Sequence, residues 1–438
     1  MMELIHLGGE RVVTGSCHLL RVNGVNTLVD CGLAQGGDQV MPMGEWPVPP
    51  GKIDFLFLTH AHIDHIGRLP EIICGGFKGE IITTEATAFL LEPMLKDALN
   101  FSDFKRDQRE RVLEEIERLT WGFEYGKEFY LKSGVRFKLG RAGHILGSAW
   151  VRFSGDCETV VFSGDIGSRE TPLLPDPDIP EPCDLLVMES TYGDRKFRIE
   201  RLGSVLSRAL ADGGKLFIPA FALGRSQELL YEMDRLFSDS EWLELFPELV
   251  DANVPVFLDS PLGLKITEIY SKLGRFWNLE SRGLLAGDDH PLDFDNLYGV
   301  DSYQRHHRLL DYEGAGVIVA GSGMCSGGLI IDHLKAGIGE RRNDILFVGY
   351  RAQGTSGRDI LKYHQRPGAY VYLDDKKYDI RARVHQLSGY SAHADCGDLV
   401  AWVSAMAEKP GKIKLVHGDP EAQKALAGKL VGSGFAVV

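Results

Sequence analysis

The stretch IDFLFLTHAHIDH (residues 53–65) begins with seven mostly apolar residues and ends in a run of histidine and aspartate. A short apolar run of this kind is typical of a buried β-strand. Residues i and i+2 of an extended segment point to the same side, so His60 and His62 can bind one metal ion. Asp64 and His65 follow where the next helix is expected to begin, placed to address a second ion. The motif therefore predicts a metal site at the end of a strand.

The segments on both sides of this motif alternate between short strands and glycine-bearing turns. The expected strands are GSCHLLRV (15–22), VNTLVDCG (25–32), EFYLKSG (128–134), VRFKLGRA (135–142), AWVRFSG (149–155) and TVVFSGD (159–165). Residues 85–120 have the i, i+3/i+4 apolar spacing of two helices. We expect these segments to form a first domain over residues 1–194.

Strands alternate with helices from DLLVMES (184–190) onward. The strands expected here are KLFIPAF (215–221), VPVFLDS (254–260), VIVAG (317–321) and ILFVGY (345–350). Such alternation is the pattern of a mostly parallel α/β sheet. Strand-like segments return after about residue 370. The sequence thus predicts an α/β domain over residues 195–370, inserted into a first domain that resumes over residues 371–438.

The composition is that of an ordinary globular protein, with 438 residues, 44% hydrophobic and 25% charged. No apolar run is long enough for a membrane helix, and the first residues lack the pattern of a signal peptide. The seven cysteines are scattered without a CxxC pair, which favours a reducing cytoplasm. The net charge of −14 disfavours a general polyanion binder, although bound divalent cations can reverse the local field.

The four polar residues of the motif are too few for two ions, because each divalent ion needs four to six ligands. The missing ligands are expected at strand ends. His144 lies between two expected strands, and Asp165 closes TVVFSGD. Asp30, which ends NTLVD (26–30), is expected to orient a metal-binding histidine.

The order Asp30, HAHIDH, His144 and Asp165 resembles the metallo-β-lactamase superfamily of metal-dependent hydrolases. The resemblance extends to its β-CASP branch of nucleic-acid processing enzymes, through three further residues. These are Glu189 in LLVMESTYGD, His393 in GYSAHAD and His417 in LVHGD. The resemblance implies an αββα sandwich interrupted by an inserted α/β domain, and the change of pattern noted above independently predicts the insertion.

The resemblance also implies a role for each residue. One ion would be held by His60, His62 and His144, the other by Asp64, His65 and His417, with Asp165 bridging them. In such a site two ions share a hydroxide that attacks a phosphate. Ligands rich in histidine favour zinc, with manganese as second choice. Asp64 is counted among the catalytic residues as well as the ligands.

Two histidines bear on the substrate and on the leaving group. A histidine at position 417 accompanies the RNA-directed members of the branch, so RNA is expected and DNA is disfavoured. His393 is expected to be the general acid, with Glu189 holding its tautomer and charge. The alternative for His393 is a helix-capping or core histidine.

Three loops are candidates for binding substrate phosphates. They contain Ser322 and Ser326 in GSGMCSGG (321–328), Arg225 in AFALGRS (220–226) and Arg351 in GYRAQGTSGR (349–358). Backbone N–H groups at a strand–helix turn can receive an anion. Arg225 could equally fix its loop. Basic clusters at 195–196, 306–308, 341–342 and 376–377 are expected on the surface, where together they would line an RNA groove.

The leading hypothesis is an endoribonuclease that resembles the enzymes of pre-mRNA 3′-end formation and their prokaryotic relatives. A 5′→3′ exonuclease of the ribonuclease J type is the alternative, disfavoured because only 21 residues follow His417. A small-ester or thioester hydrolase would not need the inserted domain, and a scaffold with a degenerate site would not keep every ligand. The particular RNA, the cleavage site, protein partners and the oligomeric state, a homodimer included, stay open.

Overall fold

The computed structural model describes residues 2–196, 202–238, 245–250, 254–287, 290–349, 351, 354–387, 389 and 392–438. The chain divides into two units. Unit 1 comprises residues 1–196 and 392–438, and unit 2 comprises residues 197–391.

Unit 1 contains two six-stranded sheets. The first has the order β1 (Glu3–Gly8), β2 (Cys17–Val22), β3 (Val25–Val29), β4 (Phe55–Phe57), β5 (Glu80–Thr84) and β6 (Thr120–Phe123). The second has the order β20 (Lys412–Val416), β11 (Leu185–Glu189), β10 (Thr159–Phe162), β9 (Ala149–Ser154), β8 (Arg136–Arg141) and β7 (Glu128–Tyr130). β3 to β6 are parallel, as are β10, β11 and β20.

The two sheets pack through a shared apolar core. Phe57 of β4 is fully buried, and its ring lies 4.9 Å from that of Phe137 and 4.7 Å from that of Phe153. Because Phe137 and Phe153 belong to the second sheet, these edge-to-face contacts join the two layers. The core forms where the inward-facing residues of both sheets meet.

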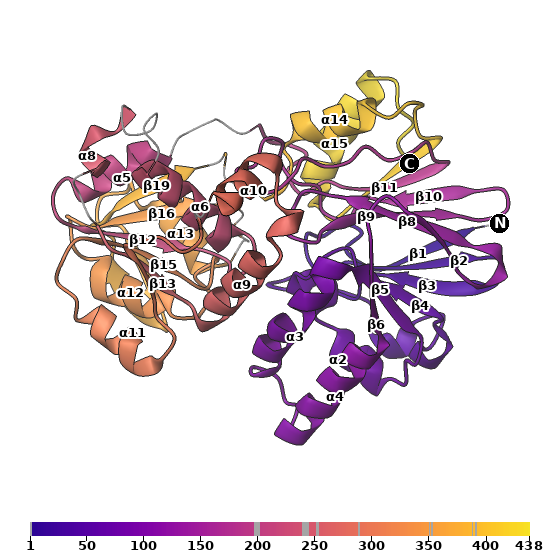
Figure 1. Cartoon of the computed structure of the whole chain (residues 1–438), viewed down its shortest axis with the longest axis horizontal. Helices are drawn as coiled ribbons and strands as arrows, with labels where there is room; N and C mark the ends of the chain where they lie inside the picture. The colour runs from indigo at the N-terminus through magenta and orange to yellow at the C-terminus, as the bar shows by residue number, and fades with distance from the viewer. Residues whose placement is uncertain are drawn as a thin grey trace. The chain divides into compact units, whose positions relative to one another are not determined.

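Helices cover the outer faces of the two sheets, as Figure 1 shows for unit 1. The first sheet carries α1 (Ile63–Ile66), α2 (Leu69–Cys74), α3 (Glu85–Leu99) and α4 (Arg106–Leu119), and the second carries α14 (Cys396–Ser404) and α15 (Pro420–Gly432). Short 3₁₀ turns lie at η1 (Met43–Glu45), η2 (Pro50–Lys52) and η3 (Lys132–Gly134). The expected αββα sandwich is therefore confirmed. β6 was not predicted from the sequence, because TWGF (120–123) is short and none of its residues is buried.

Unit 2 is built on a parallel sheet of six strands. Its order is β14 (Leu297–Gly299), β13 (Val256–Asp259), β15 (Gly316–Ala320), β12 (Lys215–Pro219), β16 (Asp344–Val348) and β19 (Arg383–Leu387). The helices are α5 (Leu202–Leu210), α6 (Arg225–Ser238), α8 (Pro247–Val250), α9 (Pro261–Lys272), α10 (Leu279–Ala286), α11 (Tyr303–Leu310), α12 (Ile330–Gly337) and α13 (Ser356–Tyr363), with a 3₁₀ turn at η4 (Gly274–Phe276). This is the inserted α/β domain that the pattern predicted.

The second domain boundary differs from the expected one. The chain re-enters unit 1 at residue 392 rather than at residue 371. The hairpin of β17 (Tyr370–Leu373) and β18 (Lys376–Asp379) belongs to unit 2, and β19 pairs in parallel with β16. The sequence suggested strands after residue 370 but could not reveal which sheet they would join.

None of the helices in the described part of the chain is long and apolar enough to cross a membrane.

Candidate metal centre

The histidine motif lies directly after the parallel strand β4, where the chain leaves the first sheet. Backbone hydrogen bonds fix this exit: Leu58 N–H donates to Ile82, and Ala149 N–H donates to Thr59. His62 is extended, with φ −69° and ψ 148°, and α1 begins at the next residue. The expected extended segment followed by a helix is therefore present.

The other predicted ligands come from the ends of neighbouring strands. His144 lies in the loop between β8 and β9, where Ser148 Oγ accepts its backbone N–H at 3.0 Å. Asp165 follows β10, and His417 follows β20 with a φ of 50°. The N–H of His417 donates to Gly9 at 2.7 Å. Strand ends at one edge of the two sheets thus bring together residues that are far apart in the sequence.

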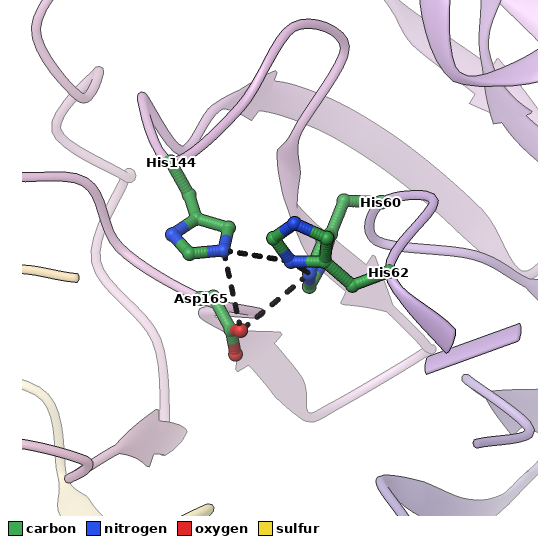
Figure 2. A group of neighbouring side chains, drawn as sticks. All are labelled: His60, His62, His144 and Asp165. Atoms are coloured by element: carbon green, nitrogen blue, oxygen red, sulfur yellow. Dashed lines mark hydrogen bonds and ion pairs between the residues drawn. The ribbon is translucent and has the colours of Figure 1, made fainter. Parts of the chain in front are cut away.

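Four side chains form the first group, which Figure 2 shows. His62 Nδ1 lies 3.1 Å from Nε2 of His60 and 3.1 Å from Nε2 of His144. Asp165 Oδ2 lies 3.5 Å from His60 Nε2 and 3.6 Å from His144 Nε2. A tetrahedral zinc site with bonds near 2.0–2.1 Å has ligand-to-ligand edges of roughly 3.3 Å. The four atoms therefore have the spacing of a four-coordinate metal site.

Asp64, His65 and His417 form a second group. Asp165 Oδ2 lies 3.3 Å from His65 Nε2, and its Oδ1 lies 3.4 Å from His417 Nε2. The two oxygens of this one buried carboxylate thus reach both groups. The geometry suits the bridging role that the resemblance implied for Asp165.

Several buried polar atoms of this site have no hydrogen-bond partner within the described residues. They are His65 Nε2, Asp165 Oδ1 and both ring nitrogens of His417. Buried polar groups are almost always satisfied, so such a concentration calls for an explanation. Metal ions would satisfy His65 Nε2, Asp165 Oδ1 and one ring nitrogen of His417, and a set of five imidazoles and two carboxylates suits zinc.

The electrostatics of the histidines also fit metal binding. Burial lowers the pKa of His60, His144 and His417 well below the usual value, and neighbouring imidazoles add to this. Neutral rings offer a lone pair to a cation. His65 differs: burial lowers its pKa, but the charges of Asp165 and Asp30 raise it well above the usual value.

Asp30 is placed to orient His65, as the sequence suggested. Its Oδ2 lies 2.7 Å from His65 Nδ1, which leaves Nε2 facing Asp165. Asp30 also accepts the backbone N–H of Thr59 at 2.8 Å and the Thr59 hydroxyl at 2.9 Å. Ser16 Oγ donates to it at 3.3 Å. Neither Thr59 nor Ser16 was predicted from the sequence, although Thr59 directly precedes the motif.

His393 and Glu189 form a pair beside the two groups. His393 Nδ1 lies 3.2 Å from each carboxylate oxygen of Glu189 and 3.9 Å from Asp165 Oδ2. Glu189 ends β11 and accepts the backbone N–H of Ile166 at 2.6 Å. Burial alone would lower the pKa of His393, but the charges of Glu189 and Asp165 raise it to about 9. The ring therefore tends to hold a proton at neutral pH.

The predicted phosphate-binding residues lie in unit 2. Ser322 Oγ accepts the backbone N–H of Ser326 at 3.3 Å. Arg225 is buried and paired with Glu228, which favours the view that it fixes its loop. Arg351 is also buried, and its guanidinium donates to the carbonyl of Val348 at 2.7 Å.

One residue of the basic clusters does not lie on the surface. His306 is buried, and its ring contacts carboxylates, so the expectation of a solvated patch at 306–308 is wrong at this residue. Arg341 and Arg342 are exposed, as are Lys376 and Lys377.

Comparison with known proteins agrees with the fold and the site. Three family models match the chain: the metallo-beta-lactamase superfamily over residues 11–201, the Beta-Casp domain over residues 226–360, and the Zn-dependent metallo-hydrolase RNA specificity domain over residues 377–438. Ribonuclease TTHA0252 of Thermus thermophilus is 37% identical, across 98% of this chain and 96% of that protein. The chain is thus a metal-dependent hydrolase, and it belongs to the β-CASP branch of the metallo-β-lactamase superfamily.

A more distant relative and a solved structure extend the comparison. Transcription termination factor FttA of Methanocaldococcus jannaschii is 28% identical, across 94% of this chain and 66% of that longer protein. The crystal structure of a protein of unknown function from Enterococcus faecalis covers 96% of this chain and 95% of its own, with a TM-score of 0.53 and 12% identity. At that identity the likeness supports the fold alone.

Proposed function

We propose that this chain hydrolyses internal phosphodiester bonds of RNA, with two divalent ions held by seven side chains and His393 as general acid. The observation that carries the proposal is the convergence of two ligand groups on Asp165, whose Oδ2 lies near both groups and whose Oδ1 lies near His417 of the second. Two cations a few ångströms apart suit an in-line displacement at phosphorus, in which both the attacking and the leaving oxygen gain negative charge.

The ions are proposed to be zinc, with manganese as second choice. His60, His62 and His144 would hold one of them, and Asp64, His65 and His417 the other. Bound there, the ions would supply an acidified water and neutralise charge on the phosphate. Asp165 would keep the two sites at a fixed spacing, because its carboxylate belongs to both.

His393 is proposed to protonate the leaving oxygen. Glu189 accepts from Nδ1, and this leaves the second proton of the imidazolium on Nε2, available for donation. Glu189 is itself held by the backbone N–H of Ile166, so its orientation does not depend on His393. Glu189 thus acts as the positioning residue and His393 as the acid.

RNA is the proposed substrate for two reasons. A relative that this chain matches over nearly its whole length is named a ribonuclease. The RNA specificity family model covers the segment that contains His393 and His417. Binding of substrate phosphates by Ser322, Ser326, Arg225 and Arg351 stays a prediction, as do exclusion of DNA, a homodimer and a cytoplasmic location.

Cleavage of RNA labelled at its 5′ end tests the proposal. We expect internal fragments from the zinc-loaded protein, and DNA of the same sequence should be cut far more slowly. Mononucleotides released from the 5′ end would instead indicate the exonuclease of the ribonuclease J type. A zinc-loaded protein that cuts neither structured nor unstructured RNA would contradict the proposed function.

A further inference from the structure

A second cluster of potential metal ligands lies in unit 2, in the interior of the α/β domain. Asp259 ends β13, His306 belongs to α11 and His333 belongs to α12. The residues are 0%, 2% and 2% exposed, respectively. Asp259 Oδ2 lies 2.6 Å from His306 Nδ1 and 2.6 Å from His333 Nε2. A carboxylate buried to this degree requires compensation of its charge.

The ring of His306 lies between two carboxylates. Its Nδ1 faces Asp259, and its Nε2 lies 3.5 Å from Asp332 Oδ2 without a hydrogen bond in the described structure. A neutral imidazole has one N–H and one lone pair, so one of its nitrogens would turn a lone pair toward a negative charge. A cation at Nδ1 removes this conflict, because Nε2 then carries the proton and points to Asp332.

A comparable arrangement, with the roles of the two ring nitrogens exchanged, occurs in the metal centre of unit 1. There His65 directs Nδ1 to Asp30 and Nε2 to the ligand group. A histidine that binds a metal usually donates its other N–H to a carboxylate or carbonyl, which fixes its tautomer. Asp332 would serve His306 in this way. The second oxygen of Asp259, Oδ1, is buried without a hydrogen-bond partner among the described residues and is free to join the ligand set.

We propose that Asp259, His306 and His333 bind a divalent metal ion of the zinc class, separate from the ions of the catalytic centre. Two imidazoles and a carboxylate are a common set for zinc, with the remaining position taken by water. Binding would open the Oδ2-to-nitrogen separations from 2.6 Å to roughly 3.3 Å, the edge of a zinc tetrahedron. A cavity of about 380 Å³ has His333, one of the three proposed ligands, in its lining.

The position of the cluster suggests what the ion would do. Asp259 is the register partner of Ala320, the last residue of β15, and the loop GSGMCSGG (321–328) begins at the next residue. The helix that carries His333 follows the same loop. An ion bound here would fasten α11 and α12 to the end of β13 and so brace both ends of the loop. The metal site does not depend on the proposed function, although the loop is one of the predicted phosphate-binding segments.

Anomalous diffraction from crystals of the full chain grown with ZnCl₂ tests the site directly. We expect a zinc peak among Asp259, His306 and His333, in addition to any peaks in unit 1. The proposal is overturned if unit 1 holds zinc and no peak appears at this cluster, because His306 is then a protonated imidazole between two carboxylates. RNA cleavage is measured separately, so failure of this site and failure of the proposed nuclease activity are distinguishable.

Zinc content of purified variants gives a second, independent measurement. His306→Ala is expected to lower the zinc bound per chain by one ion. His307→Ala is the matched control, because His307 is the exposed neighbour on the same helix and should keep the full content. Equal zinc content in the wild type and both variants would contradict the proposal. The wild-type diffraction experiment keeps the proposal testable if His306→Ala fails to fold.

Discussion

The carboxylate of Asp30 provides a sharp test of how the metal centre is held together. Asp30 is buried and accepts hydrogen bonds from Thr59 N–H at 2.8 Å, from the Thr59 hydroxyl at 2.9 Å and from His65 Nδ1 at 2.7 Å. In Asp30→Asn the shape is kept, but one acceptor oxygen becomes an NH₂ group. At least one of these donors then faces another donor.

The size of the effect follows from these contacts. Loss of the partner that orients a metal-binding histidine typically costs 10–100-fold in metal affinity or activity, or about 1.4–2.7 kcal/mol. A buried donor left without a partner costs about 1–3 kcal/mol in stability. We therefore expect Asp30→Asn to bind zinc roughly 10–100-fold more weakly and to unfold at a lower urea concentration.

Zinc affinity is measured by competition with a chelator of known affinity. The matched control is Asp54→Asn, because Asp54 also accepts a backbone N–H, that of Asn26 at 2.9 Å, but contacts none of the metal-binding residues. We expect this control to bind zinc like the wild type. If Asp30→Asn and Asp54→Asn both bind zinc with wild-type affinity, the reasoning about Asp30 is wrong.

Three further substitutions test other parts of the account. His393→Ala should slow RNA cleavage about 10²–10⁴-fold without changing zinc content, because the substitution removes the proposed general acid but none of the proposed metal ligands. An unchanged cleavage rate would refute the acid role. Phe57→Ala should lower the free energy of unfolding by about 3–5 kcal/mol in urea titrations, because Phe57 joins the two sheets, and a loss below about 1 kcal/mol would contradict that packing. In Gly32→Ala the new Cβ would lie 1.6 Å from the carbonyl oxygen of Asp64, so the backbone beside the proposed ligands Asp64 and His65 must move. We therefore expect zinc content and melting temperature to fall together, and wild-type values of both would be inconsistent with this contact.

Much of the site could be predicted because it depends on local rules. The spacing of His60 and His62 in an extended segment places both side chains on one side, and a histidine or aspartate at a strand end is a natural ligand position. His144 and Asp165 followed from strand ends and His417 from the resemblance, and the structure brings all of them together.

The cluster in unit 2 could not be predicted, because it depends on tertiary packing. His306 lies in the basic run HHR (306–308) and was expected on the surface, but α11 turns it inward against Asp259. Asp259 ends a strand as a ligand would, yet nothing in the sequence links it to the histidines that follow 47 and 74 residues later. The end of the inserted domain at residue 391 could not be predicted for the same reason, since the pairing of β19 with β16 is a long-range contact.

The most direct test of the central claim compares the wild type with the double variant His60→Ala/His65→Ala, which removes one ligand from each proposed catalytic ion. Native mass spectrometry counts the zinc ions, and the same samples are assayed for RNA cleavage. We expect the double variant to hold two fewer zinc ions than the wild type and to have lost RNA cleavage. Equal zinc content, or cleavage at the wild-type rate, would contradict a two-metal nuclease at this site.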